Sequence, residues 1–159
     1  MKRFSAATTV LVCTVLALGA NPTALDEMID LSATLRSLDE ILRAEQFDRL
    51  PWDRAVILSG AIASIDHLVP EEDSFQVLLE LVDGEWLNPA EIRTYRAYII
   101  ASGSDYLPRF PLRLPRDPGP EVIVTNQRVL VIGWIVDVWE DFDGSLAVVV
   151  DAANIRRIR

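Results

Sequence analysis

The spacing of apolar residues changes near residue 54, and the two spacings predict two kinds of structure. Between residues 23 and 50 the apolar positions recur close to every 3.6 residues, which is typical of an amphipathic helix. These positions are Leu25, Met28, Ile29, Leu35, Leu38, Ile41 and Leu42. Thr23 can cap the first turn, so we expect a helical segment over residues 23–50 that packs on a sheet. The segment is either one helix or two helices with a break near Leu31-Ser32.

After Arg54 the pattern is typical of β-strands, because short apolar or alternating runs are separated by turn residues. The expected strands are 55–65, 74–82, 91–101, 127–140 and 145–151. Asp83-Gly84 and Asp143-Gly144 predict tight turns. Gly60 and Gly133 are isolated within strands, which indicates bulges or bends of the kind that a closed sheet requires.

Residues 103–120 interrupt this pattern with five prolines, so neither a helix nor a central strand is expected there. This proline-rich insertion also carries Arg109, Arg113 and Arg116, a locally basic stretch. The rest of residues 54–159 predicts one domain without internal repeats.

Residues 1–20 have the order of a secretory signal: Lys2 and Arg3, an apolar run, then small residues. The run of about 15 apolar residues is short for a membrane span, which needs about 20; an uncleaved anchor is the alternative. Cys13 would leave with the signal, and the mature chain would then lack disulfides and thiol chemistry. We expect a periplasmic or secreted protein with no membrane span in the mature chain.

The strand segments resemble a known family. Val56–Ile62, Phe75–Leu79 and Val129–Ile135 are similar to strands of exported bacterial OB-fold proteins and of the related tRNA-anticodon-like domains. The resemblance implies a mainly β fold, a five-stranded OB-fold-like barrel preceded by an N-terminal helix. It also implies binding rather than catalysis. The proline-rich insertion departs from the family, which has a short helix at that point.

OB-folds hold ligands with the loops joining strands one to two and four to five. Under this resemblance the two loops supply the candidate ligand-binding residues, which are Asp66, His67, Glu71, Glu72, Asp73, Glu140, Asp141 and Asp143. If the loops meet, their carboxylates repel phosphates and favour a divalent cation or a basic partner. Acidic loop tips that only keep the domain soluble are the alternative. Asp141-x-Asp143-Gly144 resembles part of a calcium loop but lacks the distal glutamate.

Charge and residue usage exclude several classes. The chain has 24 acidic and 15 basic residues, a net charge of −9, which argues against nucleic acid as a partner. His67 is the single histidine, and the mature chain has no cysteine, so neither a catalytic triad nor a zinc site is expected. We therefore predict no enzyme activity, no catalytic residue, no metal ligand set and no cofactor.

The four tryptophans, Trp52, Trp86, Trp134 and Trp139, could stack on bases, as aromatic residues do in OB-folds. Residues 129–138 are apolar on both faces, however, which favours core positions. The leading hypothesis is a non-catalytic exported module that binds a protein or another non-nucleic ligand. The alternative is single-stranded nucleic-acid or oligosaccharide binding on the face of strands 74–82 and 91–101. An unrecognised hydrolase is a third hypothesis.

Overall fold

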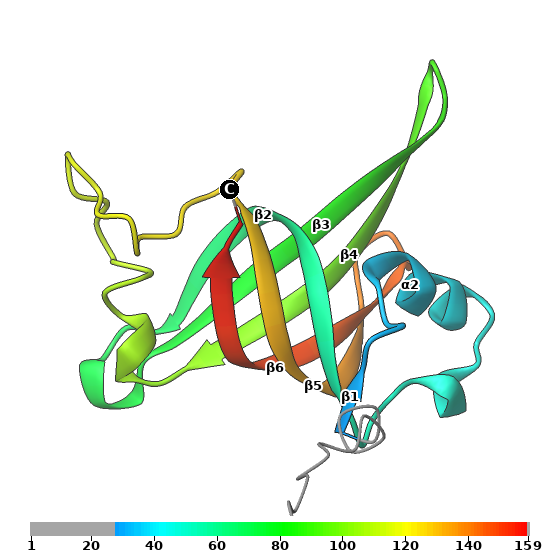
Figure 1. Cartoon of the computed structure of the whole chain (residues 1–159), viewed down its shortest axis with the longest axis horizontal. Helices are drawn as coiled ribbons and strands as arrows, with labels where there is room; N and C mark the ends of the chain where they lie inside the picture. The colour runs from blue at the N-terminus through cyan, green and yellow to red at the C-terminus, as the bar shows by residue number, and fades with distance from the viewer. Residues whose placement is uncertain (1–27, 159) are drawn as a thin grey trace, which may run out of the picture.

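The computed structural model describes residues 28–158 and is mainly β-structure (Figure 1). Its elements are β1 (Ile29–Asp30), α2 (Leu35–Arg43), η1 (Phe47–Arg49), β2 (Ala55–Val69), η2 (Glu72–Ser74), β3 (Gln76–Asn88), β4 (Glu91–Ser102), η3 (Ser104–Tyr106), β5 (Arg128–Glu140) and β6 (Leu146–Arg157). The predicted signal peptide, residues 1–20, lies outside the described residues. Within the described chain no helix is both long and apolar enough to cross a membrane.

The sheet closes on itself because β2 pairs with two different strands. Its first half, Ala55 to Ala61, is antiparallel to β5, and its second half, Ala61 to Val69, is antiparallel to β3. β3 pairs with β4, β4 runs parallel to β6, and β6 pairs with β5, which completes a ring of five strands. β1 adds two parallel residues beside β2. The predicted five-stranded OB-fold-like barrel is confirmed.

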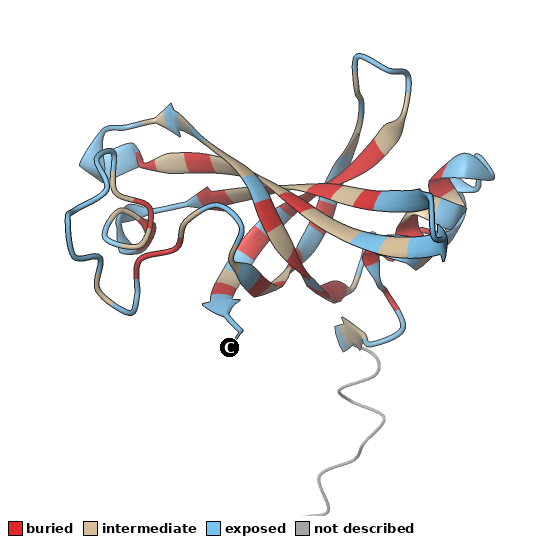
Figure 2. Cartoon of the chain, turned by 90° about the horizontal axis from the view of Figure 1, so that it is seen from above, coloured by how far each residue is buried: buried red, intermediate tan, exposed pale blue. Residues whose placement is uncertain are grey.

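Alternation along the strands places one face of each strand in the barrel. In Figure 2 buried and less buried bands alternate along the strands. On β3, Val77, Leu79 and Leu81 are buried, whereas Leu78 and Glu80 between them are not. Among residues 28–158 the buried set contains no charged side chain. Apolar burial therefore dominates the stability of the barrel, at about 25 cal/mol per Å² removed from water.

Helix α2 is shorter than the sequence predicts. It begins after Thr34, whose hydroxyl accepts a hydrogen bond from the Ser37 amide, while the Ser37 hydroxyl accepts one from the Thr34 amide. This capping box fixes the start of the helix. Leu35, Leu38 and Leu42 turn into the core. Of the predicted segment before Thr34, residues 23–27 lie outside the described residues, and residues 28–33 contain β1, whose backbone pairs with β2.

The two strand glycines lie where backbones approach closely. A Cβ at Gly60 would be 2.6 Å from the Val82 carbonyl oxygen, and one at Gly133 would be 2.2 Å from the Asp151 carbonyl oxygen. Gly60 lies where β2 changes partner, and Gly133 lies at a shift in the β5–β6 register. The predicted role of these glycines in bending a closed sheet is confirmed.

The predicted turn at Asp83-Gly84 is wrong. β3 continues through both residues, and the chain reverses at residues 89–90 instead, where the Asn88 side chain accepts a hydrogen bond from the Ala90 amide. Continuous pairing with β4 overrides the local turn preference. Since β2 pairs with β3 no further than Val82, the rest of the β3–β4 hairpin projects from the barrel as an arm (Figure 1).

The proline-rich insertion forms no strand, as predicted, and packs beside the C-terminal half of β6. The Tyr106 hydroxyl donates a hydrogen bond to the Ala152 carbonyl oxygen at 3.2 Å, and the Arg109 guanidinium donates one to the Ile155 carbonyl oxygen. The Ile123 amide then bonds the Arg109 carbonyl oxygen at 2.9 Å. β4 pairs with β6 no further than Asp151, so the insertion satisfies edge carbonyls that no strand reaches.

We expect Gly133→Ala to lower the free energy of unfolding by about 1–3 kcal/mol, the usual effect of overpacking, because the new Cβ would overlap the Asp151 backbone. Gly84→Ala is the matched control: it also lies in a strand, but its Cβ would have 3.4 Å to its nearest neighbour. Urea denaturation of both variants measures the difference. Equal stability of the two variants would contradict the close approach at Gly133.

Candidate ligand-binding face

The two predicted acidic loops do not meet. Asp66 and His67 lie within β2. Glu71, Glu72 and Asp73 lie just before β3 begins at Gln76, which pairs with Ser102 at the end of β4. Glu140, Asp141 and Asp143 lie at the β5–β6 turn. In Figure 1 the segment after β2 and the β5–β6 turn are on opposite sides of the barrel.

Register explains this separation. Asp141 forms an ion pair with Arg96, and Arg96 lies opposite Val82, six positions along β3 from Gln76. At about 3.3 Å per residue this corresponds to about 20 Å along the strand. The expected concentration of carboxylates at one end of the barrel, on which the choice of a cation or a basic partner depended, is therefore wrong.

His67 has a structural contact. Its Nε2 lies 2.9 Å from the Phe110 carbonyl oxygen, and its ring meets the Phe75 ring edge-on at 5.9 Å. The side chain is half-buried and links β2 to the proline-rich insertion. The predicted loop around His67 is instead a longer strand, because β2 continues to pair with β3 as far as Val69.

Acidic side chains of the β5–β6 turn also have partners within the chain. Asp143 accepts hydrogen bonds from the Ser145 amide at 2.9 Å and from the Ser145 hydroxyl, and these lower the pKa of Asp143. Gly144 has φ of 78°, a left-handed conformation that suits the predicted turn. In the part of the chain that the structure describes, no group of three or more His, Cys, Asp or Glu is arranged to hold a metal ion.

An aromatic surface lies on the outside of β3, β4 and the end of β5, and we call it the aromatic face. It consists of Leu78, Tyr98, Trp139 and Phe142, which line a shallow groove of about 390 Å³ together with the carboxylates of Glu140 and Asp141. The Tyr98 and Trp139 rings are 5.5 Å apart and tilted by 41°. Phe142 is fully exposed. The face therefore presents three rings from two strands and one turn.

Strand pairing brings these residues together. Tyr98 points outward from β4 between buried Ala97 and Ile99, and Trp139 reaches it from β5 across β6. The β5–β6 turn then places Phe142 beside them. Aromatic rings held in this way can stack on planar or flat ligands.

Charges around the aromatic face are partly compensated. Arg96 pairs with Asp141 and lies 3.9 Å from Glu80. The Tyr98 hydroxyl is 3.3 Å from an Asp141 carboxylate oxygen. Burial of the Tyr98 hydroxyl, and next the negative charge of Asp141, raise the pKa of Tyr98 above its ordinary value.

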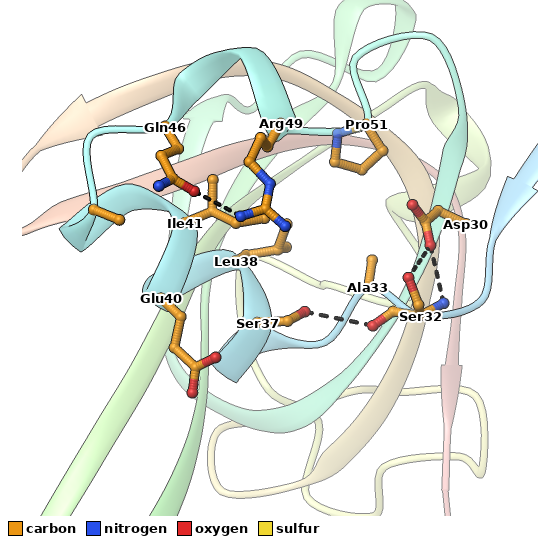
Figure 3. Close-up of a pocket in the computed structure, with 11 residues that line it drawn as sticks. Asp30, Ser32, Ala33, Ser37, Leu38, Glu40, Ile41, Gln46, Arg49 and Pro51 are labelled. Atoms are coloured by element: carbon orange, nitrogen blue, oxygen red, sulfur yellow. Dashed lines mark hydrogen bonds between the residues drawn. The ribbon is translucent and has the colours of Figure 1, made fainter.

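A second hollow, of about 430 Å³, lies beside α2 (Figure 3). Several of its polar groups bond one another: Arg49 donates to the Gln46 side chain at 2.7 Å, and the Ser32 amide donates to Asp30 at 2.9 Å. Figure 3 shows these hydrogen bonds as dashed lines between residues that line the hollow. We therefore do not place the candidate site there.

The prediction that the tryptophans lie in the core is wrong. Trp52, Trp86 and Trp134 are exposed by 43%, 68% and 46%, and Trp139 is half-buried on the aromatic face. An apolar run on both faces of a strand does not identify the inner face. The sequence signal that could have located the site is the outward register of Leu78 and Tyr98 in their alternating strands.

No protein-family model matches the chain, and no curated protein matches it. Solved structures with a similar fold include a small single-stranded DNA-binding protein from Streptomyces coelicolor, at 14% identity and a TM-score of 0.43 over 65% of this chain and 93% of that chain. A Plasmodium falciparum SSB in complex with ssDNA has 12% identity and a TM-score of 0.43 over 66% and 94%. PriB from Ralstonia solanacearum has 10% identity and a TM-score of 0.40 over 65% and 97%. At these identities the likeness concerns the fold alone.

The descriptions of the first two of these proteins name single-stranded DNA, which runs against two expectations: a protein or other non-nucleic ligand, and nucleic acid as an excluded partner. The negative charge on which the exclusion of phosphates depended is dispersed, because the acidic loops are apart and Asp141 is paired with Arg96. The descriptions of those proteins name DNA binding and no enzymatic reaction. The periplasmic or secreted location depends on residues 1–20, outside the described chain, and stays a prediction.

Stability is expected to fall as the pH rises above about 10. The unfolded chain loses the Tyr98 proton near that pH, whereas the folded chain keeps it to a higher pH, so unfolding becomes more favourable in this range and is unaffected below it. Tyr98→Phe should reduce the slope of the free energy of unfolding against pH. It should not abolish that slope, because the pKa values of Tyr95 and Tyr106 are raised too. Urea denaturation across pH 9 to 11 (about one unit on either side of the ordinary value) measures both slopes. Identical slopes would contradict the assignment.

Proposed function

We propose that the chain binds single-stranded nucleic acid by stacking bases on the aromatic face. The observation that carries the proposal is the pair of Tyr98 and Trp139 rings, 5.5 Å apart on the open side of the sheet, with exposed Phe142 beside them. Three neighbouring rings can engage successive bases of one strand, and every base offers a flat face to stack on.

Stacking also fits the apolar floor of the groove. Leu78 lines the groove together with the rings, and Ile100 is the next outward residue of β4 after Tyr98. Base–aromatic stacking contributes about 1–3 kcal/mol per base. Two or three stacked bases would therefore supply most of a moderate affinity without a long positive groove.

The charges of the face predict a shallow salt dependence. Arg96 is bound to Asp141 beside the rings, and it is already shared between Asp141 and Glu80. Each phosphate neutralised on a single strand contributes about −0.7 to the slope of log K against log salt. A strand that contacts one cation should therefore show a slope near that single value.

An oligosaccharide is the second candidate for the same face, and the surrounding acids favour it. Glu140 and Asp141 line the groove with carboxylate oxygens, which accept hydrogen bonds from sugar hydroxyls. The rings would then stack on the apolar side of a sugar. OB-folds bind both ligand classes with this region of the barrel.

We also infer a place among tRNA-anticodon-like OB-fold domains. The strand residues Val56–Ile62 and Val129–Ile135 support it, because each places a glycine at a close approach of the barrel.

The test is fluorescence anisotropy of a labelled oligothymidylate at low salt. Tyr98→Ala and Trp139→Ala should each weaken binding by about 5- to 150-fold, the equivalent of one lost stacking contact. Trp86→Ala is the matched control, because it removes an exposed tryptophan from the arm, away from the groove, and should leave the affinity unchanged.

Absence of oligothymidylate binding by the native protein would refute the nucleic-acid proposal. Oligosaccharide binding that is lost in Tyr98→Ala would then select the second candidate. Equal losses in Trp86→Ala and Trp139→Ala would remove the aromatic face as the site of either ligand.

A further inference from the structure

A groove of about 480 Å³ lies between the proline-rich insertion and the end of β6. Its charged and polar lining residues are Arg109, Glu121, Asn154, Arg156 and Arg157. We call it the arginine groove. It gathers three guanidinium groups against one carboxylate in a chain whose net charge is −9. The overall composition, which is acidic, does not account for this local excess of positive charge.

Arg109 is held in place by the fold. Its guanidinium lies 5.6 Å from the centre of the Tyr106 ring and donates a hydrogen bond to the Ile155 carbonyl oxygen. A guanidinium has five N–H donors, so others stay free to bond a ligand. Because the backbone of β6 and the ring of Tyr106 fix its position, little side-chain entropy would be lost on binding.

Arg156 and Arg157 carry charge that the surrounding chain does not neutralise. Both are exposed, and among residues 28–158 no carboxylate forms an ion pair with either. Other arginines of the described chain do form ion pairs, namely Arg36, Arg43, Arg54, Arg96 and Arg128. Three arginines without an ion pair within residues 28–158, namely Arg109, Arg156 and Arg157, thus lie around one groove.

We propose that the arginine groove is a binding site for phosphate groups. Guanidinium groups bind phosphate oxygens with paired N–H donors, and the Asn154 amide would add a neutral donor. The site is distinct from the aromatic face. Tyr98 lies beside Val149, and Arg156 is seven residues farther along β6, which corresponds to about 23 Å along the strand.

The phosphate can belong to a nucleic-acid strand or to a free phosphorylated small molecule, because both present the same oxygens. The first probe is inorganic tripolyphosphate, titrated into the whole chain by calorimetry. The Arg156→Ala/Arg157→Ala double variant should lose at least tenfold in affinity. Arg93→Ala is the matched control, since Arg93 is exposed on the arm and also lacks an ion pair within the described chain; it should bind as the native protein does.

Absence of tripolyphosphate binding by the native protein would overturn the proposal, as would equal affinities in the double variant and the native protein. An equal loss in Arg93→Ala would also overturn it, because net charge rather than the groove would then decide binding. The Tyr98→Ala/Trp139→Ala variant should keep its tripolyphosphate affinity, which separates this proposal from the stacking proposal.

Two outcomes of a further binding experiment identify the source of the phosphate. Oligothymidylate affinity that falls in the Arg156→Ala/Arg157→Ala variant would assign the groove to the backbone of a strand. Oligothymidylate affinity that is unchanged, while tripolyphosphate binding is lost, would assign it to a phosphorylated small molecule. Either result supports a phosphate site.

Discussion

The double pairing of β2 is the constraint on which the rest of the molecule depends. One strand can join both β3 and β5 only if it bends sharply, and the bend brings the Val82 carbonyl oxygen to a distance that excludes any side chain at Gly60. On the other side of the barrel the β5–β6 ladder shifts its register beside Gly133. Two glycines therefore let an otherwise continuous apolar sheet close around one core.

Closure also decides which side chains can meet a ligand. Because the ring is complete, each strand has an inner and an outer face, and the outer faces of β3, β4 and β5 are curved together. Tyr98 and Trp139 become neighbours although 41 positions separate their numbers in the sequence. The arginine groove has a different origin, since it forms where β6 extends past the end of β4 and the insertion covers it.

The strands could be predicted because alternation and isolated glycines are local signals. The remaining errors concern properties set at a distance. The strand β2 is longer than its local pattern indicates because β3 pairs with it as far as Val69, and this register separates the two acidic loops. Trp134 is exposed because an apolar run does not reveal which side faces the core. Net charge is likewise a sum over the chain, whereas the charge at one site depends on local ion pairs such as Arg96–Asp141.

The insertion is fixed at its two ends and exposed between them. Tyr106 and Arg109 join it to β6, and the amide of Ile123, just past its end, bonds the Arg109 carbonyl oxygen, whereas residues 112–118 are exposed. The entropy of closing a loop rises only with the logarithm of its length, so each doubling costs about 0.6 kcal/mol. Natural variation can therefore lengthen or rewrite residues 112–118 almost freely while the barrel stays folded. This short stretch is where descendants of the same architecture could acquire new binding preferences.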